Sequence, residues 1–242
     1  MNEWFEEIKR HFIMNFIDDD RWRFMLNGLV ATLRITLFAL LIGIAIGIVI
    51  AIVRSTYDKN VEKMRPGPGR FMLKVFDMIC KLYLTVIRGT PVVVQLLIFY
   101  FVILTSIKSG VIICIIAFGI NSGAYIAEIF RSGIMSIDNG QFEAGRSLGF
   151  NYIQTMRHII IPQAFKNILP TLANEFIVLL KETAVAGYVA VQDLTKAGHI
   201  ISGRTYSYFM PLAAVALVYL ILVMFFTWLV GRLERRLRSS ER

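Results

Sequence analysis

Long apolar runs, separated by short polar stretches, dominate the pattern of hydrophobic and polar positions along the chain. A helix needs about 20 largely apolar residues to cross the roughly 30 Å hydrocarbon core of a bilayer. The clearest run is Pro211–Val230, which contains no charged residue, and Leu37–Val53 is similar. The pattern predicts five membrane spans, at roughly 27–53, 72–105, 110–131, 163–188 and 208–231. The second contains Pro91, where we expect a break or kink because the ring removes a helical hydrogen bond.

The N-terminal segment is acidic rather than continuously apolar; its acidic residues are Glu3, Glu6, Glu7, Asp18, Asp19 and Asp20. A cleaved signal would need an apolar core segment and a small-residue cleavage site. We therefore expect an amphipathic surface helix followed by a short acidic turn. The predicted organisation is this segment (1–23), a single transmembrane domain (24–232) and a basic tail (233–242).

The distribution of Lys and Arg predicts the orientation in the membrane. Basic residues follow the first span, as Arg54, Lys59, Lys63, Arg65 and Arg70, and the fifth, as Arg232, Arg235, Arg236, Arg238 and Arg242. Cytoplasmic loops are the ones rich in Lys and Arg. We therefore expect the N-terminus outside and the 54–70 loop, the 132–162 loop and the C-terminus inside.

Composition supports a membrane protein and argues against a soluble enzyme. The chain has 242 residues, of which 56% are hydrophobic and 18% charged, whereas soluble domains average roughly 45–50% and about 25%. In so apolar a chain, a formal net charge of +9 points to anionic lipid headgroups rather than nucleic acid. Cys80 and Cys114 form neither a disulfide framework nor a metal-binding spacing.

The segment 136–162 carries the most distinctive pattern. Its apolar positions Phe142, Leu148, Ile153 and Met156 recur at roughly helical spacing. We expect Glu143 to begin a short helix, Gly149 to permit a sharp turn, and Pro162 to occupy the first turn of the next helix. A two-helix knob of this kind suits a groove on another protein. Glu143 also suits a simpler role, as an acidic first-turn residue that stabilises the helix dipole.

This segment resembles the coupling loop of ABC importer permeases, whose pattern is Glu-Ala-Ala, three residues, Gly, nine residues, then Ile-x-Leu-Pro. The matching residues are Glu143, Ala144, Gly145, Gly149, Ile159, Ile160, Ile161 and Pro162. Gly145 replaces the second Ala and Ile161 replaces Leu. Arg88–Gln95, Ser122–Arg131, Pro162–Ala164 and Leu180–Thr183 resemble the polar amino-acid branch of the family.

The resemblance implies an all-α membrane protein with the type I importer fold, in a bacterial plasma membrane. It implies a permease that forms a dimer, receives an amino acid from an extracytoplasmic binding protein and contacts a separate ATP-binding subunit. ATPase coupling would fall to Glu143, Ala144, Gly145, Gly149, Ile159 and Pro162. The chain has no Gly-x4-Gly-Lys-[Ser/Thr] phosphate loop. ATP and magnesium are therefore expected on the partner, and this chain is expected to be no enzyme and to bind no metal or cofactor.

Polar residues inside the predicted spans need a partner or a function; the candidates for the substrate pathway are Glu175, Glu182, Asn121, Ser122 and Asn174. Glu175 and Glu182 are seven residues apart, so their carboxylates share one helical stripe and suit a substrate ammonium group. Alternatively, Lys181 or Arg34 neutralises them. Asn121, Ser122 and Asn174 serve equally well as interhelical hydrogen-bonding groups.

Other sequence features remain open to a structural role. We expect Glu128 and Arg131 to form an ion pair, and the pairs Gly43/Gly47 and Gly119/Gly123 to allow close helix crossings. The alternative function is an ion-coupled secondary transporter in which Glu175 or Glu182 carries the proton. Such folds usually have paired repeats and more spans, and none is evident here. The sequence leaves open which amino acid is carried and whether the permease dimer is made of identical chains.

Overall fold

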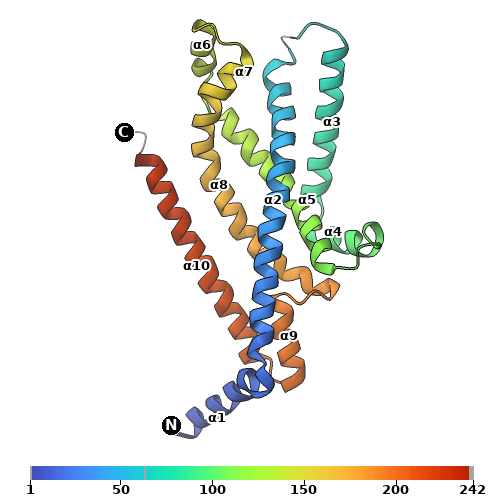
Figure 1. Ribbon diagram of the computed structural model, residues 1–242, viewed down its shortest axis with the longest axis vertical. Coiled ribbons are helices and arrows are strands. Elements are labelled where there is room, and N and C mark those ends of the chain that lie inside the picture. Colours follow the sequence, from blue (N-terminus) through green and yellow to red (C-terminus); the bar gives the residue numbers. More distant parts are fainter. Residues whose placement is uncertain (1, 63, 240–242) are drawn as a thin grey trace. The chain divides into compact units, whose positions relative to one another are not determined.

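The computed structural model describes residues 2–62 and 64–239, and all regular structure in those ranges is helical, as expected (Figure 1). The long helices are α2 (Trp22–Asn60), α3 (Pro68–Gly89), α5 (Gly110–Met135), α8 (Ile161–Glu182) and α10 (Phe209–Ser239). The shorter helices are α1 (Asn2–Phe12), α4 (Val92–Ile98), α6 (Asn139–Ser147), α7 (Tyr152–Thr155) and α9 (Leu194–Thr205). Lys63 and Arg242, two of the residues used to predict orientation, lie outside the described residues.

The number of membrane spans differs from the five expected. Within the described residues, α2, α5 and α10 are long and apolar enough to cross a membrane, and α3 with the bent segment after it makes a fourth if that pair crosses as one span. Helix α8 is long enough but not apolar enough to count as a span in the same way, because Lys166, Glu175 and Lys181 lower its mean hydropathy. The structure therefore supports three or four spans by length and composition.

The break expected at Pro91 is present. Helix α3 ends at Gly89, and Thr90 takes up the extended conformation (φ −121°, ψ 146°) that residues before proline favour. A separate helix, α4, begins at Val92. The predicted second span is therefore divided into two helices at Pro91.

The chain forms two compact units, which we describe separately. One comprises Met1–Ala39, Val92–Phe118 and Ile177–Trp228, and the other comprises Leu40–Pro91, Gly119–Phe176 and Leu229–Arg242. Helices α2, α5, α8 and α10 contribute residues to both. We call them the first unit and the second unit.

In the first unit, buried Asn15 ties the N-terminal segment to the end of α9. The Asn15 amide nitrogen donates to the Ser207 hydroxyl at 3.2 Å, and the Thr205 hydroxyl donates to the Asn15 carbonyl oxygen at 2.8 Å. The segment itself consists of α1, a π-helical turn and the turn Asp18–Asp20. Its amphipathic helix and acidic turn occur where the sequence predicts them.

In the second unit, small residues let α2 and α5 cross closely. A Cβ atom on Gly47 would lie 2.6 Å from the Ile126 side chain and 3.0 Å from the Ala127 backbone nitrogen. A Cβ atom on Gly123 would lie 3.0 Å from Ile46. The predicted role of Gly43, Gly47 and Gly123 in close packing is therefore confirmed.

Candidate functional site

The segment 136–162 folds into two short helices, α6 and α7, that precede α8 in the second unit (Figure 1). Helix α6 begins at Asn139, because the Asp138 carboxylate accepts a hydrogen bond from the Gly140 nitrogen at 2.6 Å and caps the helix. Glu143 consequently lies in the second turn. The expectation that Glu143 begins the helix, and the first-turn role that depends on it, are both wrong.

The turn between α6 and α7 depends on Gly149. This residue has φ +79°, a left-handed conformation in which L side chains are strained. The Phe150 nitrogen donates to the Gly145 carbonyl oxygen at 3.0 Å, which closes the C-terminal end of α6. The sharp turn expected at Gly149 is therefore confirmed.

Helix α7 has its own start signal, which the sequence reasoning did not identify. Asn151 and Gln154 form a reciprocal capping box, with both side-chain-to-backbone hydrogen bonds at 2.9 Å. The signal was present as Asn-x-x-Gln just after Gly149. With a cap on each helix and a fixed turn between them, the pair is preorganised before any partner binds.

Exposed apolar side chains mark the surface of this pair. Leu148 is 70% exposed and Ile153 is 74% exposed, and both flank the Gly149 turn. A pocket of about 390 Å³ at the α6–α7 pair is lined by Glu143, Arg146 and Lys59, among others. The Lys59 ammonium donates to the Asn139 side-chain oxygen at 2.6 Å, so the end of α2 joins this surface. Lys59 therefore belongs to this site, although sequence spacing alone could not place it there because it lies 80 residues before Asn139.

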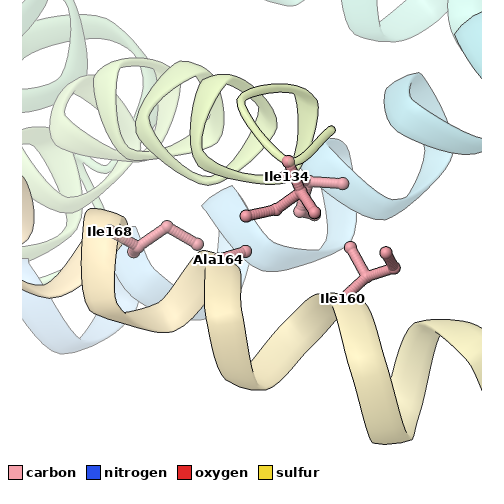
Figure 2. Close-up of a cluster of buried hydrophobic side chains, with 5 residues drawn as sticks. Ile134, Ile160, Ala164 and Ile168 are labelled. Atoms are coloured by element: carbon pink, nitrogen blue, oxygen red, sulfur yellow. The ribbon is translucent and has the colours of Figure 1, made fainter. Parts of the chain in front are cut away.

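A hydrophobic cluster fixes the pair to the rest of the second unit. Figure 2 shows Ile134 of α5 facing Ile160, Ala164 and Ile168, which lie on the π-helical turn Met156–Ile160 and on α8. Ile159 is partly buried against this cluster, and Pro162 lies in the first turn of α8 as expected. Ile159 and Ile160 therefore anchor the segment, whereas the side chains on its outer surface are Leu148 and Ile153.

A polar pair lies elsewhere in the second unit, between α5 and α8. The Ser122 hydroxyl donates to a Glu175 carboxylate oxygen at 3.0 Å. Ser122 and Asn121 are buried, whereas Asn174 is exposed. The structure thus brings Ser122 and Glu175 together. Glu182 is the last residue of α8 and belongs to the first unit, where it is partly buried.

The ion pair expected between Glu128 and Arg131 is present. The Arg131 guanidinium donates two hydrogen bonds to one Glu128 oxygen, at 3.1 and 3.0 Å. Asp58 of α2 is a second partner of Arg131, at 3.3 Å. Among the described residues, no three His, Cys, Asp or Glu side chains are grouped as a metal ion would require.

Comparison with known proteins identifies a family. Residues 67–239 match the family model described as "binding-protein-dependent transport system inner membrane component". The chain is 35% identical over 221 residues to an arginine transport system permease of Bacillus subtilis, covering 90% of this chain and 94% of that protein. It is 41% identical over 166 residues to a putative glutamine transport system permease of Rickettsia typhi, covering 67% and 76%.

Solved structures have the same fold. A chain of an amino acid ABC transporter crystallised with histidines matches with a TM-score of 0.77 and 40% identity, over 88% of this chain and 94% of that one. A methionine ABC transporter in an inward-facing form matches with a TM-score of 0.74 at 19% identity, which bears on the fold alone. The chain therefore belongs to the family of binding-protein-dependent transport system inner membrane components, as a multi-pass membrane permease with the type I ABC transporter fold.

Proposed function

We propose that this chain is the permease subunit of an ATP-driven amino-acid importer, coupled to a separate ATPase through the 143–162 segment. The observation that carries the proposal is the preorganised α6–α7 pair, which presents Leu148 and Ile153 on either side of Gly149. Exposed apolar side chains on a rigid helical knob suit the groove of a partner protein. Relatives named as arginine and glutamine permeases support an amino acid as the substrate.

The knob can transmit movement because it is packed onto α5 and α8. Ile134, Ile160 and Ile168 form a close-packed cluster that joins the segment to both helices, and such cores resist deformation. A displacement of α6 and α7 would therefore move α8, which carries Glu175 thirteen residues beyond Pro162. ATP binding at the partner would change the substrate path through this connection.

The substrate pathway is proposed to include Glu175. Its carboxylate suits the ammonium group that every amino acid carries, and the Ser122 hydroxyl holds one of its oxygens at 3.0 Å. Asn121, Asn174 and Glu182 remain candidates for the same pathway on sequence grounds. Buried Asn121 and Ser122 equally stabilise helix packing.

The remaining components follow from the same proposal. The assembly contains a second permease, identical or paralogous, an extracytoplasmic amino-acid-binding protein, and an ATPase subunit that holds ATP and magnesium. The setting is a bacterial plasma membrane. The basic residues around 54–70 and 232–238 support a cytoplasmic location for the α6–α7 pair.

The proposal is tested with Gly149→Asp and the matched change Gly67→Asp. Asp tolerates a positive φ better than most residues, so Gly149→Asp keeps the turn while it adds a charge between Leu148 and Phe150. Gly67 has extended backbone, and among the described residues the nearest atom to an added Cβ would be the Arg65 carbonyl oxygen at 4.0 Å. We expect the ATPase subunit to co-purify with Gly67→Asp but not with Gly149→Asp, at equal membrane levels. Normal ATPase binding and transport in Gly149→Asp would overturn the coupling assignment.

A further inference from the structure

A pocket lined by basic residues lies in the second unit, between α2, α3 and α5. Its volume is about 450 Å³, and its charged lining residues are Arg54, Lys81, Arg88 and Glu128. We call it the basic pocket. None of these residues belongs to the α6–α7 pair or to the Ser122–Glu175 pair.

The carboxylates near the basic pocket do not balance its three cations. Buried Asp77 lies 2.8 Å from the Lys81 ammonium and 3.8 Å from Arg54, so one carboxylate serves two cations. Glu128 accepts two hydrogen bonds from Arg131, which lies outside the pocket lining. Positive charge therefore remains in the pocket.

Arg88 is the clearest source of that charge. Its guanidinium lies 5.7 Å from the centre of the Tyr125 ring, and within the described part of the chain it has no carboxylate at ion-pair distance. The ring holds the guanidinium in place by a cation–π interaction and leaves its N–H groups available. An arginine held in this way suits a bidentate anion such as phosphate.

The position of the basic pocket along the helices favours a lipid. Arg54 directly follows the apolar run Leu37–Val53, which places it where a span meets the headgroup layer. Met78, Leu82 and Val86 of α3 are exposed apolar residues spaced four apart, so they form one stripe beside the pocket residues Lys81 and Thr85. A cationic pocket next to an exposed apolar stripe has the two parts that a phospholipid requires.

We propose that the basic pocket binds the phosphate of an anionic phospholipid through Arg54, Lys81 and Arg88, with an acyl chain along Met78, Leu82 and Val86. Basic pockets between membrane helices bind anionic headgroups for the same electrostatic reason. The bound lipid bridges α2, α3 and α5 at the level of the Asp77 ion pairs. It would act as a structural ligand of the permease, separate from the transported substrate.

The test is native mass spectrometry of the delipidated transporter containing the full chain, titrated with phosphatidylglycerol and, separately, with phosphatidylcholine. We expect tighter binding of phosphatidylglycerol. Arg88→Gln should weaken that binding about fivefold, the effect of losing one basic residue near an anionic headgroup. Arg88→Lys should restore part of it. The thermal midpoint in phosphatidylcholine shows whether each variant is folded, and we expect it to be unchanged.

Two controls distinguish a specific phospholipid site from nonspecific electrostatic attraction of anionic lipid to the protein. Lys74→Gln removes an exposed charge from the same helix, seven residues before Lys81 and outside the pocket lining, and should leave the affinity unchanged. Glycerol 3-phosphate supplies the phosphate without acyl chains and should not compete at concentrations where the lipid binds. Equal losses in Arg88→Gln and Lys74→Gln, or full competition by glycerol 3-phosphate, would each overturn the proposal.

Discussion

Gly145 and Thr155 are in contact where α6 and α7 pack together. A Cβ atom on Gly145 would lie 2.6 Å from Cγ2 and 2.7 Å from Oγ1 of Thr155, and both residues are buried. The two helices can approach this closely because residue 145 has no side chain. The family pattern places alanine at this position. Here the residue is glycine, and the Thr155 side chain occupies the space that an alanine methyl group would need.

Gly145→Ala should therefore destabilise the α6–α7 pair. Overpacking costs about 1–3 kcal/mol, partly offset by the roughly 1 kcal/mol that alanine gains over glycine in a helix. Adding Thr155→Ala should recover the loss, because it removes both clashing atoms and the Thr155 hydroxyl has no hydrogen-bond partner among the described residues. Hydrogen exchange across 139–155 measures the local stability. A double variant no better than Gly145→Ala would argue against this contact.

Glu175→Gln should weaken amino-acid binding with little effect on stability. Glutamine keeps the shape and an oxygen to accept from Ser122, but it loses the charge that would bind an ammonium group. Charge-assisted hydrogen bonds contribute about 1.5–3 kcal/mol, so we expect roughly tenfold to hundredfold weaker binding by calorimetry. Glu62→Gln, an exposed carboxylate, is the control. Unchanged affinity in Glu175→Gln would assign this residue a purely structural role.

Two glycine-to-alanine changes should have opposite effects on thermal stability. Gly47→Ala places a methyl group 3.0 Å from the Ala127 backbone nitrogen, which cannot move independently, and should lower the thermal midpoint. Gly231 lies on α10, and an added Cβ atom there would meet no atom of the described residues within 4 Å, so Gly231→Ala should raise stability by about 0.5–1 kcal/mol through helix propensity. Thermal unfolding in the same detergent measures both. Equal effects would mean that the α2–α5 crossing tolerates the added methyl group.

Asp193 directly precedes α9 and caps that helix. Its carboxyl group should make the stability of the protein depend on pH. Burial raises the pKa of its carboxyl above 3.8, against the lowering by hydrogen bonds from the Lys196 and Thr195 nitrogens. The native state therefore binds the proton more strongly than the unfolded state, and this contribution to stability falls as pH rises from 3.8 through the raised pKa. Asp193→Asn should abolish that fall.

Thermal midpoints measured from acidic to neutral pH test this expectation. Asn keeps an oxygen acceptor for the cap, so Asp193→Asn should be at least as stable as the original chain at neutral pH. Asp193→Ala removes the cap and should be about 1 kcal/mol less stable than Asp193→Asn at every pH. If Asp193→Asn and Asp193→Ala lose the same stability, the charge of Asp193 is required at this position.

Features set by local chemistry could be predicted from the sequence. Pro91 breaks the second predicted span because its ring constrains Thr90 and removes a donor, and neither effect needs tertiary contacts. Gly149 permits its turn for an equally local reason. The start of α6 is also encoded locally, because the Asp138 side chain caps the helix.

Features set by tertiary contacts could not be predicted in this way. Helix α8 was expected to continue to 188, yet it ends at Glu182 without a glycine or proline, and a 3-10 segment with buried Ala186 and Val189 follows. Lys59 reaches Asn139 across 80 residues, and Ser122 reaches Glu175 across 53. Sequence spacing identified Ser122 and Glu175 as polar residues within spans, but only the fold pairs them.

The Asn15 anchor has a consequence for biosynthesis. Its partners Thr205 and Ser207 follow it by 190 and 192 residues. At roughly 5–20 residues per second, the ribosome makes those partners about ten seconds or more after Asn15. The N-terminal segment therefore waits at the membrane through most of translation and is locked only when α9 has emerged. This anchor makes completion of the first unit one of the last steps in folding, so a stalled chain that lacks α9 leaves its N-terminus accessible to proteases.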